Sequence, residues 1–206
     1  PFLLDQKEME AAPQTFATKK AIGKGLESFG YRIQLSPLDC TGCGNCADVC
    51  PAPDKALIMR PADQEIVKQK DNWLYALQVT SKEDSVDWRT LKNSQFRTPL
   101  FEFHGACPGC GETPYIRLLT QLFGERMLIA NATGCSSIYG ASVPSFPYTT
   151  TAEGQGPAWA NSLFEDNAEF GFGMRLGGKK VEKRLIQFVG ELLADGGLSP
   201  AAKDAC

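Results

Sequence analysis

The residues best suited to chemistry are four cysteines in the first quarter of the chain. They form a Cys-x2-Cys-x2-Cys-x3-Cys-Pro run that contains Cys40, Cys43, Cys46 and Cys50. Thiolates at this spacing are typical ligands of 4Fe–4S clusters. The first three are separated by two residues each, so one tight loop can surround a cubane cluster. Gly42 and Gly44 can adopt the positive φ angles that turn backbone N–H groups toward sulfur.

The last cysteine of the run, Cys50, points to a second cluster. In proteins that hold two such clusters, this cysteine ligates the other one, so a single run implies a partner run. Residues 1–39 contain no cysteine. The sequence therefore carries half of a motif pair.

Zinc and disulfides are the alternatives for these cysteines. A zinc site would use two Cys-x2-Cys knuckles separated by about a dozen residues or more, which this run does not match. A disulfide framework is typical of small secreted scaffolds, and nothing in this sequence resembles a signal peptide.

Composition limits the function classes. The chain has 206 residues, 43% of them hydrophobic, enough for one large or two small globular units. Its 21 basic and 24 acidic residues argue against a nucleic-acid surface. The longest apolar runs are far shorter than the roughly 20 residues of a membrane span. We expect a cytoplasmic, reducing location, and we expect the chain to be part of a longer protein, because it begins without methionine and ends in a helical pattern.

A second cysteine set lies further along the chain and contains Cys107, Cys110 and Cys135. The predicted strands and helices place its two loops at the same edge of one sheet. Three thiolates are one short of a closed site, and Cys206 and His104 are the candidates for the fourth ligand. A lone histidine beside a strand end is more simply a packing residue, and Cys206 follows a predicted helix.

The elements around the first loop are predicted from alternation and turn residues. Residues 31–35 and 56–59 read as two paired strands that flank the cysteine loop. Residues 1–30 read as a connecting segment, and 64–94 as an arm that packs between modules.

The second half reads as the start of an α/β domain. Thr113 is expected to cap a helix that begins at Pro114 and ends at Gly124. Its predicted apolar face consists of Tyr115, Ile116, Leu118, Leu119 and Leu122. Residues 126–131 resemble a buried parallel strand, and 138–162 a functional loop. A long helix is expected from Phe164 to Leu193, ended by residues 195–197.

Four stretches together resemble one enzyme family. Residues 39–51, 101–114, 130–137 and 156–171 look like consecutive parts of the pyruvate:ferredoxin (flavodoxin) oxidoreductases. The resemblance covers essentially the whole chain. It implies an α/β fold with three parts: a partial ferredoxin-like domain over 1–62, a connecting arm over 63–95, and the beginning of a thiamine-diphosphate-binding domain over 96–206.

The resemblance also implies ligand roles. Cys40, Cys43 and Cys46 would hold one 4Fe–4S cluster, with its fourth ligand upstream of Pro1, and Cys50 would serve the sister cluster. The second set would hold the cluster nearest the thiamine, with its fourth cysteine beyond residue 206. Glu112 and Cys135 would line the thiamine pocket. The Gly-Asp-Gly segment that binds Mg²⁺ and the diphosphate in this family has no match here, and no catalytic residue is assigned.

The implied activity is the oxidative decarboxylation of pyruvate to acetyl-CoA and CO₂. Electrons would pass one at a time through the clusters to ferredoxin or flavodoxin, in an enzyme that is a homodimer at full length. The chain alone is expected to be inactive. A stand-alone 4Fe–4S electron carrier and an oxidoreductase for another 2-oxoacid remain as alternatives.

Overall fold

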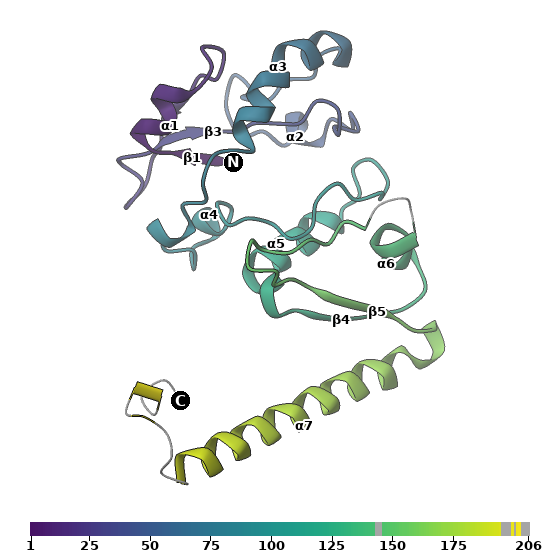
Figure 1. Cartoon of the computed structure of the whole chain (residues 1–206). Coiled ribbons are helices and arrows are strands. Elements are labelled where there is room, and N and C mark those ends of the chain that lie inside the picture. The colour runs from purple at the N-terminus through teal and green to yellow at the C-terminus, as the bar shows by residue number, and fades with distance from the viewer. Residues whose placement is uncertain (143–145, 195–198, 200, 203–206) are drawn as a thin grey trace. The chain divides into compact units, whose positions relative to one another are not determined.

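The computed structural model describes residues 1–142, 146–194, 199 and 201–202 (Figure 1). Helices and small sheets are mixed along the chain, which confirms the α/β class in its coarse form. By contacts, the chain divides into two units: residues 1–127 with 138–157, and 128–137 with the described residues from 158 onward. The boundaries at 62 and 95 stay predictions.

The first unit begins with a three-stranded antiparallel sheet. Its strands are β1 (Phe2–Leu4), β2 (Lys19–Lys20) and β3 (Gly30–Arg32), in the order β1-β3-β2. Leu3 pairs with Tyr31, and Lys19 pairs with the same residue from the other side. Leu3 and Leu4 are fully or almost fully buried. The prediction of a connecting segment over 1–30 is therefore wrong, because these apolar residues build a core of their own.

Helix α3 (Ala62–Ala76) covers part of this core. Ala76 is buried against Leu4 and Phe16. The Tyr75 ring meets the Phe16 ring edge to face, with centroids 5.1 Å apart. Two short elements follow, η1 (Glu83–Ser85) and α4 (Leu91–Ser94). The arm thus packs on the first residues of the chain.

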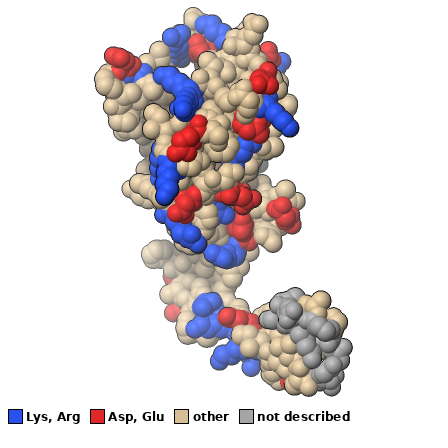
Figure 2. Space-filling model, turned by 90° about the vertical axis from the view of Figure 1, so that its left-hand side faces the viewer, with Lys and Arg blue, Asp and Glu red and all other residues tan. Residues whose placement is uncertain are grey.

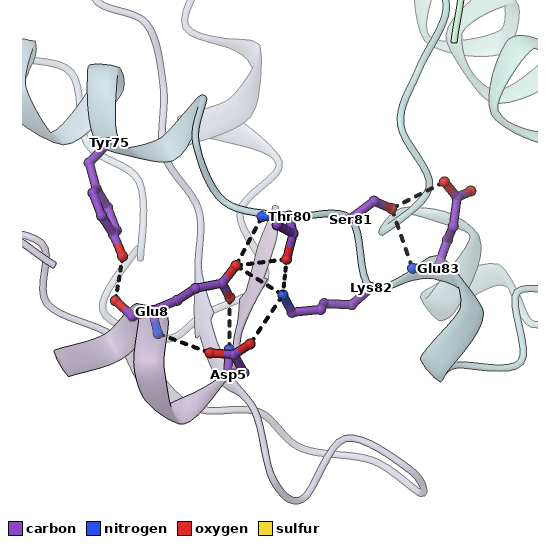
Figure 3. A network of polar contacts seen from close by, with 7 residues as sticks. All are labelled: Asp5, Glu8, Tyr75, Thr80, Ser81, Lys82 and Glu83. Carbon is purple, nitrogen blue, oxygen red and sulfur yellow. Dashed lines mark hydrogen bonds and ion pairs between the residues drawn. The ribbon is translucent and has the colours of Figure 1, made fainter. Parts of the chain in front are cut away.

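A polar network fastens helix α1 (Gln6–Ala11) to the segment after α3 (Figure 3). The Asp5 carboxylate accepts a bond from the Glu8 N–H and the Glu8 carboxylate accepts one from the Asp5 N–H, both 2.9 Å long. The Glu8 carboxylate also accepts the N–H and hydroxyl of Thr80 and the ammonium of Lys82, at 2.9, 2.8 and 2.9 Å. The Tyr75 hydroxyl donates to the Glu8 carbonyl oxygen. Side chains far apart in sequence thus share one carboxylate.

The network determines how Glu8 titrates. Burial raises the pKa of this carboxyl, but the hydrogen bonds from Thr80, Asp5 and Lys82 outweigh it and lower the pKa from 4.5 to about 2. Glu8 therefore stays ionised at any pH above the acid range.

The predicted strand pair around the cysteine loop is wrong in its second member. Residues 56–59 form no strand, and β3 pairs instead with β1 and β2. Three prolines, at positions 51, 53 and 61, remove ladder donors from this region. The Ala56 N–H, which a strand would need, donates to the Cys50 sulfur at 3.2 Å.

The first unit continues with α2 (Asn45–Asp48), α5 (Thr113–Phe123) and η2 (Gly124–Arg126), and its later segment opens with the π-helical η3 (Ile138–Ser142). Phe101, almost completely buried, bridges to Tyr148. The N-cap of α5 is Glu112, one residue earlier than predicted, and the Thr113 hydroxyl donates to the Cys110 carbonyl oxygen at 3.2 Å.

The predicted apolar face of α5 is confirmed only in part, since Ile116, Leu118 and Leu122 are half-buried. Tyr115 and Leu119 are exposed, whereas Thr120 and Gln121 are buried. Thr120 and Gln121 are buried because backbone N–H and carbonyl groups in the segment before Phe101 need hydrogen-bond partners. The Thr120 hydroxyl accepts the Leu100 N–H at 3.2 Å, and the Gln121 amide donates to the Arg97 carbonyl oxygen at 2.8 Å.

The second unit is a two-stranded parallel sheet with a long helix. Strand β4 (Leu128–Asn131) pairs with β5 (Ala158–Asn161), which confirms the parallel strand. Its burial is not as predicted, since Leu128 is exposed and Asn131 is the most buried residue of the strand. Within the described residues this sheet has only two strands, so one edge of β4 has no strand partner.

The expected long helix is confirmed as α7 (Asn167–Ala194), preceded by η4 (Phe164–Asp166). A Cβ atom at Gly171 would lie 3.3 Å from the Ala130 Cβ, so this glycine lets α7 approach β4 closely. The predicted terminator, residues 195–197, lies outside the described residues. None of the described helices is long and apolar enough to cross a membrane.

Charges of both signs are distributed over the first unit. On the face shown in Figure 2, basic and acidic side chains are interspersed. Arg97, for example, lies 3.0 Å from a Glu83 oxygen and 3.2 Å from a Glu125 oxygen.

Candidate metal centres

The first cysteine loop has the backbone that the sequence predicts. Gly42 and Gly44 adopt φ angles of 71° and 82°, in the left-handed region that favours glycine. Gly44 is the N-cap of the short helix α2, which carries Cys46 in its first turn. The thiols of Cys40 and Cys43 are exposed, as is that of Cys46. The loop therefore presents three thiols on a backbone that bends twice through glycine.

Cys50 lies in a different environment, surrounded by backbone donors. The pKa of its thiol is lowered by the N–H groups of Ala52 and Leu57, against the effect of burial, and further by Ala56 and the charge of Lys55. The Lys55 ammonium donates to the carbonyl oxygens of Asp48 and Cys50 at 2.8 and 3.2 Å. These contacts close the turn after the cysteine run and favour the thiolate, the form that binds metal.

A second turn holds Cys107 and Cys110. The Cys110 N–H donates to the Cys107 carbonyl oxygen at 3.0 Å, and Gly109 between them has a φ of 74°. Cys107 is exposed and Cys110 partly buried. The turn is thus another glycine-bent Cys-x2-Cys loop.

This second turn lies against the first loop. The Asn45 side-chain amide donates to the Gly109 carbonyl oxygen at 3.4 Å. Asn45 is placed between Cys43 and Cys46, and Gly109 between Cys107 and Cys110. No local sequence pattern predicts this contact, because the two residues are separated by 64 positions.

Cys135 belongs to the second unit, at the first position of α6 (Cys135–Ser137). It follows directly on β4 and is exposed, as expected for a ligand at the end of a parallel strand. The Gly134 N–H donates to the Ser137 hydroxyl oxygen at 2.9 Å and fixes this turn. That Cys135 shares one site with Cys107 and Cys110 stays a prediction.

The two candidates for a fourth ligand differ. The His104 ring stacks on the Phe101 ring with centroids 5.4 Å apart, and its Nδ1 accepts the Ala106 N–H at 3.3 Å. Burial lowers the pKa of His104, against a backbone hydrogen bond that raises it. These contacts favour a packing role. Cys206 lies outside the described residues.

Glu112 is exposed at the start of α5 and influences two tyrosines. Burial raises the pKa of Tyr139 well above its ordinary value, and the Glu112 charge raises it further; the same two causes raise the pKa of Tyr148. Within the described residues, the Tyr139 hydroxyl has no hydrogen bond of normal geometry, although Glu112 is close enough to shift its pKa. A thiamine-pocket role for Glu112 stays a prediction.

The chemistry of the thiols and the shape of their loops suit an iron–sulfur cluster, but the described side chains do not converge on one point. In the part of the chain that the structure describes, no three Cys, His, Asp or Glu side chains converge as metal ligands. The seven described cysteines are free thiols. Soft thiolates on glycine-bent loops are the donors that iron–sulfur clusters use. The assignment of individual ligands remains a prediction.

Comparison with known proteins agrees with this chemistry. Residues 33–52 match the 4Fe-4S binding domain family. The chain is 54% identical over all 206 of its residues to a pyruvate:ferredoxin oxidoreductase of Moorella thermoacetica, of which it covers 18%. It is 57% identical over 94% of its length to a pyruvate-flavodoxin oxidoreductase of Klebsiella pneumoniae, of which it covers 16%.

A relative with a different name shows the same likeness. The mitochondrial pyruvate dehydrogenase [NADP(+)] of Euglena gracilis is 51% identical over 97% of this chain, which covers 11% of that protein. The chain spans less than a fifth of the length of each of these three relatives. Along its whole length, the chain is thus related to one segment of the pyruvate:ferredoxin and pyruvate-flavodoxin oxidoreductases.

Proposed function

We propose that this chain is the electron-transfer segment of a pyruvate oxidoreductase that makes acetyl-CoA and CO₂. The observation that carries the proposal is the 54% identity over the whole chain to a pyruvate:ferredoxin oxidoreductase. The likeness includes both cysteine loops, whereas a stand-alone electron carrier would need only the first. Its finer architecture is a partial ferredoxin-like domain followed by the start of a thiamine-diphosphate-binding domain.

The roles that we propose for the thiols are those that the family resemblance implies. Cys40, Cys43 and Cys46 would hold one 4Fe–4S cluster, and Cys50 a neighbouring one. The N–H groups around Cys50 would stabilise charge on its sulfur, which favours the reduced state of a bound cluster. Cys107 and Cys110, with Cys135, would hold a further cluster. When bound, these clusters accept and donate single electrons.

Thiamine diphosphate fits these residues incompletely. Glu112 and Cys135 are present, but the Gly-Asp-Gly anchor for Mg²⁺ and the diphosphate has no counterpart in the sequence. We therefore assign no step of thiamine chemistry to this chain. The cofactor would be held mainly by other parts of a longer protein, of which this chain contributes one wall.

The electron acceptor is the least specified part of the proposal. Relatives of this segment are named for ferredoxin, flavodoxin and NADP(+). Segments that are 51% to 57% identical to this chain thus occur in enzymes with different acceptor names. We propose ferredoxin or flavodoxin, together with coenzyme A as acetyl acceptor, a homodimeric enzyme and a cytoplasmic location.

The test uses the complete reading frame that contains this segment, expressed and purified without oxygen. Pyruvate and coenzyme A together should reduce ferredoxin or flavodoxin, and either one alone should not. Cys110→Ser should abolish this reduction, because it removes a ligand of the cluster nearest the substrate. Thr41→Ser, a change within the first loop that keeps all cysteines, should leave it nearly unchanged.

Two results would contradict the proposal. Faster oxidation of 2-oxoglutarate or a branched-chain oxoacid than of pyruvate would assign the enzyme to another substrate. Cluster content without turnover of any 2-oxoacid would instead support the stand-alone electron carrier.

A further inference from the structure

The contact between the two cysteine loops is built from the same position in each. Asn45 occupies the gap between Cys43 and Cys46, and Gly109 the gap between Cys107 and Cys110. The Asn45 amide nitrogen lies 3.4 Å from the Gly109 carbonyl oxygen, and both residues belong to the first unit. The loops therefore meet through the residues that separate their thiols.

The backbone on each side is shaped for this approach. Gly44, with a φ of 82°, starts the turn that presents Asn45, and Gly109 has a φ of 74°. A Cβ atom at Gly109 would lie 3.1 Å from the Asn45 amide nitrogen and 3.5 Å from its oxygen. Any side chain at Gly109 would therefore both strain its own backbone and crowd Asn45. The close approach depends on glycine.

The long hydrogen bond lies at the surface, so its contribution to stability is small. Its effect on position is larger, because the thiols on either side of Asn45 and of Gly109 are fixed to the same short turns. A shift of the amide contact moves one set of sulfurs relative to the other. Because electron transfer slows steeply as donor and acceptor move apart, even a small displacement of one loop lowers its rate.

We propose that Asn45 is a positioning residue that sets the distance between the two cysteine loops and thereby the rate of electron transfer between them. The inference rests on the proposed function, in that both loops hold clusters. With clusters bound, the loop of Cys107 and Cys110 would hold the donor of one electron and the first loop its acceptor. No bond forms or breaks and no proton moves, so the protein controls the step through distance.

The experiment compares wild type with Asn45→Ala in the complete, anaerobically purified enzyme. Iron and sulfide contents should be equal, because Asn45 is not a ligand. After reduction with dithionite, the magnetic coupling between neighbouring clusters, seen as splitting in electron paramagnetic resonance spectra, should weaken in the variant. Rapid mixing should show electron arrival at the first-loop cluster slowed several-fold. Asn45→Gln, which keeps an amide, should restore part of the magnetic coupling and part of the transfer rate.

Glycine variants provide a matched pair. Gly109→Ala should weaken the coupling as Asn45→Ala does, whereas Gly111→Ala, with nothing within 4 Å of the added carbon, should not. Because Asn45 and Gly109 act through one contact, the effects of the double variant should be less than additive.

Unchanged coupling and rate in Asn45→Ala would overturn the inference. Loss of iron as complete as in Cys43→Ser would also overturn it, because Asn45 would then be needed for cluster assembly. The coupling is measured with dithionite and without pyruvate. An enzyme with coupled clusters that does not oxidise pyruvate would therefore contradict the proposed function and leave the role of Asn45 supported.

Discussion

Replacing Glu8 with glutamine should destabilise the first unit by about 2 kcal/mol at neutral pH. The change keeps the shape of the side chain but removes the charge that binds Asp5, Thr80 and Lys82. The fall in the pKa of Glu8 from 4.5 to about 2 corresponds to at most about 3.5 kcal/mol, because each tenfold change in proton affinity is worth about 1.4 kcal/mol. Solvent reduces this value, since Thr80 and half of the Asp5 side chain are exposed.

The pH dependence gives the sharper test. A carboxyl whose pKa is lowered by folding stabilises the protein above its unfolded pKa and loses that contribution as the pH falls through the folded value. The difference in the free energy of unfolding between wild type and Glu8→Gln should therefore be largest above about pH 5. It should decrease as the pH falls further and vanish below about pH 2.

Urea unfolding followed by circular dichroism at several pH values measures this difference. Glu10→Gln is the matched control, because Glu10 is an exposed residue of the same helix that accepts a hydrogen bond from the Gln6 amide. It should change stability by less than about 0.5 kcal/mol. Equal destabilisation by the two variants, or a Glu8→Gln effect independent of pH, would refute the account of the network.

Three further experiments test the cysteine loops and the binding of the cofactor. In the isolated chain, Cys43→Ser should remove most of the bound iron and Cys110→Ser should remove little. The reason is that the first loop gathers its thiols locally, whereas the second set must be brought together by folding. Equal iron losses in the two variants would show that the second site is already closed within the chain. Calorimetry should find no Mg²⁺-dependent binding of thiamine diphosphate tighter than the millimolar range, since the diphosphate anchor is missing, and micromolar binding would contradict this. Gly44→Ala should cost about 1 kcal/mol or more and lower the iron content, because φ is 82° there, whereas Gly111→Ala should leave both unchanged in the same assays.

The sequence predicted the backbone of the first cysteine loop more accurately than the strands around that loop. The left-handed glycines at 42 and 44 were predicted, because closely spaced thiolates demand a tight loop. The parallel strand β4 and the helix α7 were also predicted, since each has a clear hydrophobic or helical pattern over its length.

Tertiary contacts explain what the sequence did not predict. The core built on Leu3 and Leu4 comes from strands of three residues, too short for a period of two to be read. The burial of Thr120 and Gln121 reflects backbone groups that needed partners, which outweighed the apolar pattern of α5. The meeting of Asn45 and Gly109 depends on how the unit folds, and no local pattern encodes it.

The central claim is that the cysteine loops of this chain bind iron–sulfur clusters, and metal analysis tests it most directly. The chain purified without oxygen should be brown and contain iron and acid-labile sulfide in similar amounts, because thiolates at this spacing suit such clusters. Occupancy should be incomplete, since predicted ligands lie outside the chain. Stoichiometric zinc without acid-labile sulfide would contradict the claim and assign these thiols to a zinc site.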